Sequence, residues 1–255
     1  MRVRGYPAGV PCWSEVSTPD LDATRDFYGT LFGWTVVPAS VEGYAMFYLG
    51  DRAVAGIRAS PSVGWLPYVA SDDVDADVAT TVENGGAVLI APAELTDAAR
   101  IAVVSDPAGA AFGLWQRRRF AGAQVVNEFG TVSWAELATR DPASAPAFYG
   151  KVFGWEDRSA LTATGRVYTE WCRGDRYLAG MLHMDERWPA TVPAHWTVSL
   201  LVENCAATVS RVEALGGQVT LPPTDLGIGM YAQLTDTHGA GFRILELVPE
   251  LLAVL

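Results

Sequence analysis

The chain has 255 residues, of which 50% are hydrophobic and 18% charged, as expected of a globular protein with a sizeable core rather than a disordered one. Its formal net charge of −11 at pH 7 repels phosphate backbones and anionic membranes, so we expect neither nucleic acid nor a membrane as a partner. The N-terminal residues lack the apolar core of a signal peptide, and no apolar run approaches the roughly 18 residues of a membrane span, so the cytoplasm is the expected location.

The first predicted module comprises one strand, one helix and three further strands. Alternation along the chain predicts a strand over residues 10 to 17. Thr18-Pro19-Asp20 is typical of a helix start, an apolar stripe at helical spacing follows, and Gly33 predicts the helix end. The three strands are predicted over residues 34 to 38, 44 to 50 and 53 to 58.

The same order of elements returns three times along the rest of the chain, so each half contains two modules. The second module has a strand at 65 to 71, a helix at 73 to 84 with Val78 and Val82 facing inward, and strands at 87 to 91, 100 to 105 and 111 to 116. The third has a strand at 131 to 138, a helix at 142 to 153 that begins at Pro142, and strands at 155 to 158, 166 to 173 and 177 to 183. The fourth follows a connection at 184 to 194 and has a strand at 195 to 202, a helix at 204 to 215 and strands at 218 to 221, 230 to 235 and 241 to 247. We expect domains at residues 1 to 118 and 130 to 255, joined by a linker at 119 to 129.

A stretch of sequence appears twice, with equivalent residues 121 positions apart. Trp13-Ser-Glu15 leads to Phe27-Tyr28-Gly in the first half, and Trp134-Ala-Glu136 leads to Phe148-Tyr149-Gly in the second. An Asp-x-x-Gly turn precedes the last strand of each half. The chain is therefore a tandem duplication, and its halves are predicted to share one architecture.

Four strand-helix-strand-strand-strand modules with these motifs resemble the vicinal oxygen chelate superfamily, which includes glyoxalase I, extradiol dioxygenases and bleomycin-resistance proteins. More narrowly, the two fused halves look like the actinobacterial glyoxalase-like proteins. The resemblance implies an α+β fold whose paired modules curl mixed sheets around concave cavities, although fold alone does not supply the reaction. Fusion can supply within one chain the pairing that single-domain relatives obtain by dimerising, so we expect a monomer, with a homodimer as the alternative.

In metal-dependent relatives, three strand positions in each cavity carry His or Glu ligands. Carried over, the first position is Trp13 and Trp134, the second is near Leu66 or Pro67 and near Thr197, and the third is Gly113 and Arg243. These side chains do not suit a divalent cation, so we expect no metal and no other cofactor. The three cysteines are far apart, odd in number and predicted to be buried. The alternative is a displaced metal site in which Glu15 or Glu136 joins His195 or His183.

Glu15 and Glu136 are the first candidates for catalysis. Each shares a strand face with its Trp, and a carboxylate beneath an aromatic wall is a favourable setting for a general acid or base. Alternatively, each pairs with an arginine of the opposing module, Arg243 being one candidate, and only closes the cavity floor. His195, which opens a strand that faces the cavity, is the third candidate acid or base.

Aromatic residues on the predicted strands indicate a ligand cavity, because an aromatic wall with a few polar groups suits a flat or apolar organic molecule. The candidate ligand-binding residues are Trp13, Tyr44, Tyr48, Trp65, Tyr68, Trp115, Trp134, Tyr168, Trp171, His183, Trp196, Tyr231 and Arg243. All three histidines of the chain fall in the second half. One half is therefore predicted to carry the working site while the other is chiefly scaffold.

The leading hypothesis is metal-independent binding of a hydrophobic or aromatic small molecule, such as a metabolite, an antibiotic or a biosynthetic intermediate. The first alternative is a metal-free isomerase, cyclase, lyase or hydrolase that uses Glu15, Glu136 or His195 to move a proton. The second alternative is a metal-dependent glyoxalase or dioxygenase with displaced ligands.

Overall fold

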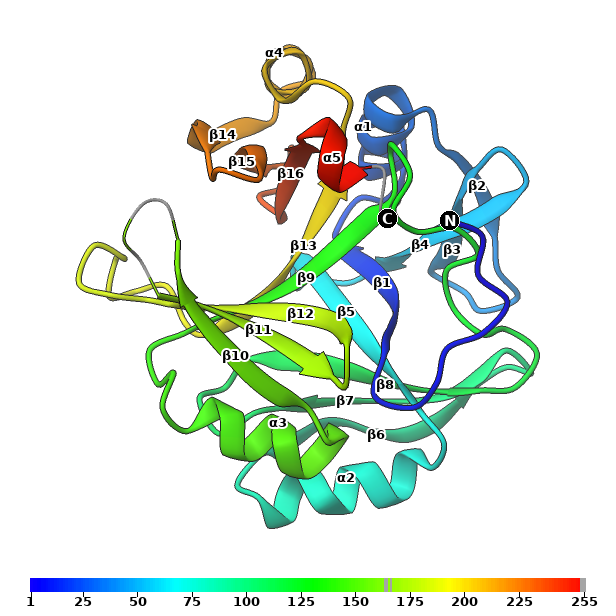
Figure 1. Cartoon of the computed structure of the whole chain (residues 1–255). Helices are drawn as coiled ribbons and strands as arrows, with labels where there is room; N and C mark the ends of the chain where they lie inside the picture. Colours follow the sequence, from blue (N-terminus) through cyan, green and yellow to red (C-terminus); the bar gives the residue numbers. More distant parts are fainter. Residues whose placement is uncertain (163–164, 166, 253–255) are drawn as a thin grey trace.

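The strands of the first half form one eight-stranded sheet in the computed structural model, which describes residues 1–162, 165 and 167–252 (Figure 1). These strands are β1 (Pro11–Thr18), β2 (Thr35–Pro38), β3 (Tyr44–Leu49), β4 (Arg52–Ala59), β5 (Gly64–Ser71), β6 (Ala87–Leu95), β7 (Ala99–Ser105) and β8 (Ala111–Arg117). Two helices accompany them, α1 (Leu21–Phe32) and α2 (Val74–Glu83).

The strands of the second half form another eight-stranded sheet. They are β9 (Val132–Thr139), β10 (Glu156–Leu161), β11 (Val167–Arg173), β12 (Arg176–His183), β13 (His195–Leu201), β14 (Gln218–Asp225), β15 (Gly229–Thr235) and β16 (Gly241–Leu247). The helices are α3 (Ala145–Phe153), α4 (Cys205–Ala214) and the short α5 (Pro249–Leu252). Within the described part of the chain, no helix is long and apolar enough to cross a membrane.

Both sheets have the same strand order, β2-β3-β4-β1-β5-β8-β7-β6 and β10-β11-β12-β9-β13-β16-β15-β14. In each, the first strands of the two modules pair antiparallel at the centre, and each of them pairs parallel with the last strand of its own module. The predicted α+β fold of four modules is therefore confirmed, and the sequence duplication is also a structural one.

The predicted end of the first helix at Gly33 is confirmed, whereas its start lies later than predicted, because Thr18 belongs to β1 and Asp20 is the N-cap. The side chain of Asp20 accepts a hydrogen bond from the backbone N–H of Ala23 at 3.0 Å, which caps the start of α1. At the other end, Gly33 has a left-handed backbone (φ 72°), and its N–H donates to the carbonyl of Gly29. Gly154 ends α3 with the same geometry (φ 67°), so a side chain at either position would be strained.

Three predictions about local structure were wrong. Helix α3 begins at Ala145 rather than Pro142, because the Asp141 side chain accepts from the N–H of Ser144 and holds those residues in a turn. Val82 is 50% exposed, since the inward side of α2 follows Val74, Val78 and Thr81. Strands β6 and β14 run past their prolines and extend to Leu95 and Asp225, because both are edge strands with irregular pairing.

Each helix packs on strands of its own half and lies beside a helix of the other half (Figure 1). Helix α1 lies beside α4, and the core beneath them combines Phe27, Tyr28 and Leu31 with Val209, Val212 and Phe242. Helix α2 lies beside α3, above a core that combines Val74 and Phe112 with Phe148, Tyr149 and Trp155. Neither of these two cores beneath the helices is therefore completed by one half alone.

The repeated Phe-Tyr-Gly stretch makes the hydrogen bonds that join the halves. Tyr28 donates to Asp236 at 3.3 Å and Tyr149 donates to Asp106 at 3.0 Å, so each tyrosine reaches the Asp-x-x-Gly turn of the other half. The indole of Trp34 donates to the carbonyl of Gly130, and that of Trp155 to Gly9. The Phe-Tyr-Gly motif was interpreted as packing within one module. In the structure it also makes contacts between the two halves.

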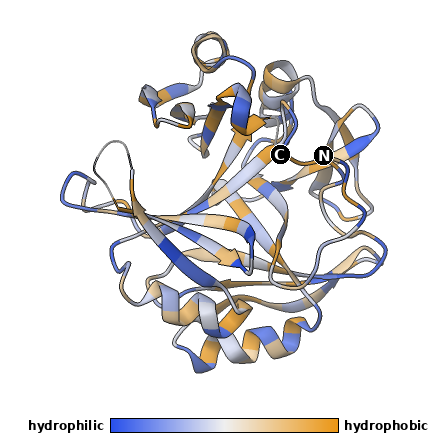
Figure 2. Ribbon diagram, in the orientation of Figure 1, coloured by the Kyte–Doolittle hydropathy of each residue, from blue (hydrophilic) through white to orange (hydrophobic). Residues whose placement is uncertain are grey.

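Strand β10 is an exposed edge strand of the second sheet. All six of its residues are exposed, and Figure 2 shows its hydrophilic stretch, which contains Glu156, Asp157 and Arg158. Charged residues along an edge strand oppose pairing with another chain. This edge belongs to the second sheet and borders the site described below.

Candidate functional site

Each sheet has one face packed against helices and an opposite face, called here the inner face. In β1, Val16 belongs to the core beneath α1, whereas Trp13 packs in a separate cluster on the inner face. In β9, Ala135 and Leu137 belong to the core beneath α3, and Trp134 and Glu136 alternate with them. The Trp and Glu of each half therefore share the inner face.

On the inner face of the first half, Glu15 is enclosed by hydrogen-bond donors. Its carboxylate accepts from Arg58 of β4 at 2.8 and 3.3 Å and from the Tyr68 hydroxyl at 2.9 Å. Glu15 is 2% exposed. Burial, and next the charge of Glu15, hold the pKa of Tyr68 well above its usual range, so the phenol remains a donor at neutral pH. This carboxylate is neutralised from within the protein.

The remaining space on the first inner face is filled by aromatic side chains. The ring of Tyr68 lies over Gly113, where a Cβ would stand 2.0 Å from a ring carbon. Trp115 is 2% exposed and packs beside it, with ring centroids 5.6 Å apart. Phe120 of the linker closes the cluster, its ring standing edge-on to Trp13 at 5.0 Å.

The linker and the N-terminal segment cover this filled face. Tyr6 donates to the carbonyl of Ala123, and the side chain of Gln124 accepts from the backbone N–H of Ala53 in β4. Tyr48 is partly buried against the same cluster. The first half therefore offers a packed interior at the place where the resemblance implies a cavity.

On the inner face of the second half, Glu136 forms an ion pair with Arg243 of β16. With its amide oxygen turned toward the guanidinium, Gln233 accepts from Nη2 and Nε of Arg243 at 2.8 and 2.9 Å. Arg243 is 2% exposed, and its guanidinium lies 5.8 Å from the ring centre of Tyr231. Burial lowers the pKa of Arg243 to about 9, so its guanidinium remains protonated at neutral pH.

Aromatic side chains on the second inner face are more exposed to solvent than those on the first, and two groups that fill the first face are replaced by smaller or apolar residues. Strand register places Leu182 where the first half has Arg58, and Ser199 where it has Tyr68. Trp134, Tyr168 and Tyr231 are partly exposed here, whereas their first-half counterparts Trp13, Tyr44 and Ile101 are buried.

The same tryptophan–tyrosine hydrogen bond is present in both halves. The Trp134 indole donates to the Tyr168 hydroxyl at 2.8 Å, and Trp13 donates to Tyr44 at 3.0 Å. In the second half the phenol lies across Gly180, where a Cβ would stand 2.8 Å from the Trp134 nitrogen. These aromatic groups are therefore held rigidly, whether or not solvent reaches them.

The residues present do not fit a divalent metal ion. Register confirms that Leu66 and Thr197, opposite Glu15 and Glu136, share the inner face. In the second half a guanidinium, itself a cation, lies against the Glu136 carboxylate. Among the described residues, no three His, Cys, Asp or Glu side chains are grouped closely enough to hold a metal, so the displaced ligand set is not assembled.

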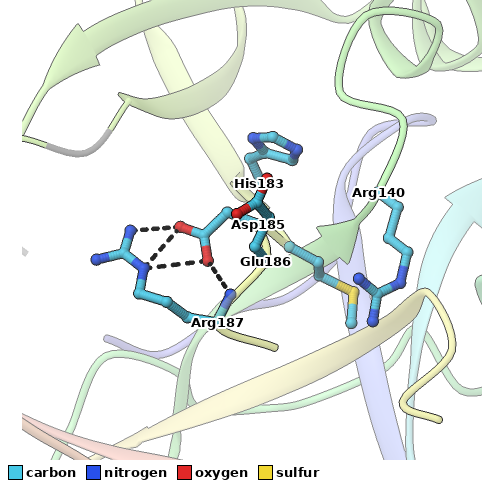
Figure 3. A pocket seen from close by; sticks show the side chains of 6 residues that line it. Arg140, His183, Asp185, Glu186 and Arg187 are labelled. Atoms are coloured by element: carbon cyan, nitrogen blue, oxygen red, sulfur yellow. Dashed lines mark hydrogen bonds and ion pairs between the residues drawn. The ribbon is translucent and has the colours of Figure 1, made fainter. Parts of the chain in front are cut away.

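The candidate histidines lie at the rim of the second half. His195 is half-exposed, stands opposite Ala138 in the register, and its Nδ1 lies 2.9 Å from the carbonyl of Pro193. His183 is exposed and lines an open hollow of about 600 Å³ together with Arg140, Met184, Asp185, Glu186 and Arg187. Figure 3 shows Arg187 paired with Asp185, while Arg140 stands apart. The hollow is charged and lacks aromatic walls, so it differs from the cavity predicted for a flat ligand.

Three of the predicted ligand-binding tryptophans do not lie on an inner face. Trp65 and Trp196 donate to the hydroxyls of Tyr28 and Tyr149, and Trp171 is buried beside Trp155. All three belong to the cores beneath the helices. The error arose because aromatic residues were counted along strands without separating the two faces.

Four inner-face residues of the second half were missed, namely Glu170, Leu182, Ser199 and Gln233. None of them is unusual as a residue type. The difference between the two inner faces appears only when each is compared with its counterpart in the first half. These counterparts are Met46, Arg58, Tyr68 and Val103.

Comparisons with known proteins agree with this architecture. The profile of the family described as "Glyoxalase-like domain" matches residues 13–115, and that of the "Glyoxalase/Bleomycin resistance protein/Dioxygenase superfamily" matches residues 131–244. CFP32 of Mycobacterium tuberculosis, a glyoxylase by name, is 39% identical over 96% of this chain and 97% of its own. The anthracycline biosynthesis protein DnrV of Streptomyces peucetius is 34% identical over 95% of this chain and 94% of its own.

The chain therefore belongs to the glyoxalase, bleomycin resistance protein and dioxygenase superfamily, as a member with two tandem domains. Solved structures share the fold at low identity. The Mn(II)-bound glyoxalase of Novosphingobium aromaticivorans has a TM-score of 0.67 at 16% identity, covering 94% of this chain and 82% of that one. The 2,3-dioxygenase LapB of Pseudomonas sp. KL28 has a TM-score of 0.66 at 15% identity, covering 95% and 96%.

Proposed function

We propose that this protein binds a flat aromatic small molecule on the inner face of its second half, without a metal ion. The first half acts as scaffold. Because the two halves already pair within one chain, we propose that the protein binds its ligand as a monomer.

The observation that carries this proposal is the difference between the two inner faces. At equivalent positions the first half has Arg58 and Tyr68, and the second has Leu182 and Ser199. This exchange leaves Trp134 and Tyr168 partly exposed beside an apolar side chain. Rigid aromatic groups with a few polar neighbours favour flat organic ligands.

The ion pair at the base of this face supports a site that works without a metal. Where the superfamily's metal-dependent members bind a cation, Arg243 supplies a guanidinium that Glu136 and Gln233 fix in place. A metal ion that took its place on Glu136 would leave the buried Arg243 guanidinium without its counter-ion, at a cost of roughly 3–5 kcal/mol. Metal entry is therefore disfavoured energetically as well as by ligand type.

The names of relatives support the class of ligand. DnrV is named for anthracycline biosynthesis, and so is the related DauV of Streptomyces sp. strain C5. An aromatic secondary metabolite or its precursor is therefore the first class to test. Acid–base catalysis by Glu15 or Glu136 has less support, because an arginine occupies each carboxylate.

The proposal can be tested with 9-(hydroxymethyl)anthracene, a flat neutral probe, by calorimetry and by quenching of tryptophan fluorescence after treatment with a chelator. Trp134→Phe removes the indole N–H that fixes Tyr168, and we expect about three- to tenfold weaker binding. The matched control is Trp13→Phe, which removes the equivalent donor from the filled half and should leave affinity unchanged. Circular dichroism checks that both variants are folded.

Two results would contradict the proposal. The first is equal loss of affinity in both variants, which would place binding elsewhere. The second is binding that appears only after Zn²⁺, Ni²⁺, Fe²⁺ or Mn²⁺ is added, which would favour a metal-dependent enzyme of this superfamily.

A further inference from the structure

Glu170 is a carboxylate on the inner face of the second half. It stands opposite Gly180 of β12, which in turn stands opposite Glu136 of β9. It is partly exposed, unlike Glu136, which is 6% exposed. Within the part of the chain that the structure describes, the Glu170 carboxylate has no hydrogen bond and no ion pair. The equivalent residue of the first half is Met46.

Among the described residues, no cation contacts the Glu170 carboxylate. Arg243 is neutralised by Glu136. Arg158 is the cross-strand neighbour of Glu170 on β10, but its guanidinium donates to the carbonyl of Gly174 at 3.0 Å and to the Tyr177 hydroxyl at 3.5 Å. Within the described part of this face, the Glu136 carboxylate is therefore paired with an arginine, whereas the Glu170 carboxylate makes no ion pair.

Aromatic rings stand next to this charge. Tyr168 precedes Glu170 by two residues on the same strand face, and Trp134 is hydrogen-bonded to Tyr168. A cation near such rings is attracted by their negative faces, and a carboxylate within reach adds a charge-assisted hydrogen bond. A protonated amine can form both interactions, whereas an anion would be repelled by the same carboxylate.

We infer that Glu170 is the residue that determines specificity here, and that the aromatic ligand carries a protonated amine which this carboxylate binds. The inference rests on the proposed function, because it needs a ligand on this inner face. The inference extends the proposed function by specifying that the ligand is positively charged, a property that the aromatic groups alone do not determine.

Three anthracenes of equal flatness separate charge from shape: 9-(aminomethyl)anthracene as the cation, 9-(hydroxymethyl)anthracene as the neutral probe and anthracene-9-carboxylate as the anion. In fluorescence titrations at pH 7 and low salt, we expect the cation to bind about tenfold more tightly than the neutral probe. The anion should bind most weakly. Added salt should reduce the difference, because it screens a partly exposed pair.

Glu170→Gln should abolish the preference, so that the cation and the neutral probe bind with equal affinity. The matched control is Asp157→Asn, which removes an exposed carboxylate from the opposite face of the neighbouring strand and should leave the preference intact. An undiminished preference in Glu170→Gln would overturn the inference. Tightest binding of the anion would also overturn it, because Arg243 would then be the group that recognises charge.

The two proposals fail in different ways. If the neutral probe binds through Trp134 but charge makes no difference, the proposed function stands and the role of Glu170 is refuted. If none of the three probes binds, the proposed function falls for flat aromatic ligands, and the inference falls with it.

Discussion

Each half has a glutamate at the equivalent position, Glu15 or Glu136, and the two halves neutralise it with an arginine from different strands. In the first half Arg58 of β4 and Tyr68 of β5 approach Glu15, and the bulk that they bring fills the inner face. In the second half Arg243 approaches Glu136 from β16, and β12 and β13 keep Leu182 and Ser199. A repeated carboxylate can therefore be a structural requirement of the fold, while its choice of partner decides whether space remains for a ligand.

The largest effect on ligand binding should follow from exchanging the partner in the second half. The triple variant L182R/S199Y/R243G rebuilds there the arrangement of Arg58, Tyr68 and Gly113 around a glutamate. Because the phenol then occupies the open space, we expect probe affinity to fall by roughly 100-fold, about 2.7 kcal/mol. Calorimetry measures this, and thermal unfolding shows whether the variant remains folded. Unchanged affinity in a folded variant would mean that this face is not the site.

Breaking one ion pair at a time should destabilise the second half more than the first. R243M leaves Glu136 without its ion-pair partner in a buried position, so we expect a loss of about 3–5 kcal/mol in the free energy of unfolding. R58M should cost less, because Glu15 keeps the Tyr68 hydroxyl and the Arg58 side chain is 27% exposed. Urea denaturation compares them, and equal losses would refute the difference drawn here.

Removing the hydroxyl of Tyr28 or of Tyr149, which join the two halves, should lower the free energy of unfolding by equal amounts. Y149F leaves Asp106 and the Trp196 indole without their shared partner, and Y28F does the same to Asp236 and Trp65. Each should lower stability by about 1–3 kcal/mol. A difference of more than about 1 kcal/mol between the two variants would show that the asymmetry extends beyond the inner faces.

The smallest effect at neutral pH concerns the buried phenols of the first half. Burial is the main cause that raises the pKa of Tyr44 and Tyr68 in the folded protein. Their contribution to stability is therefore complete below the unfolded pKa of about 10 and is lost as the pH rises above it. The triple variant adds one more buried phenol, so its stability should fall more steeply above pH 10. Denaturant titrations at pH 8 to 11 measure this slope.

The module order, most element boundaries and the duplication could be predicted from the sequence, because they depend on local signals. Gly33 caps the end of α1 as its residue type indicates, and alternation put Trp13 and Glu15 on one face. The arginine partner of Glu136 was also among the alternatives considered, because Arg243 falls at a position that the resemblance marks.

The rest depended on pairing between distant strands. Arg58 reaches Glu15 because β4 runs parallel to β1, a register that no local pattern reveals. The covering of the first half by Phe120 required knowledge of the path of the linker. The sequence did not indicate Glu170, because a glutamate on a strand next to the sheet edge is common. Only the structure shows that its carboxylate makes no ion pair with any residue that the structure describes.

The crossed packing of the helices has a consequence for the chain as a whole. Since α1 completes its core with α4 and α2 with α3, either half expressed alone would expose the aromatic side chains of both shared cores. Mixed together, the two fragments should restore one another, as the partners in a split-protein reporter do. The peptide connection ensures that one copy of each half is present in every molecule. The complementary side chains of the two shared cores are what make the halves bind each other.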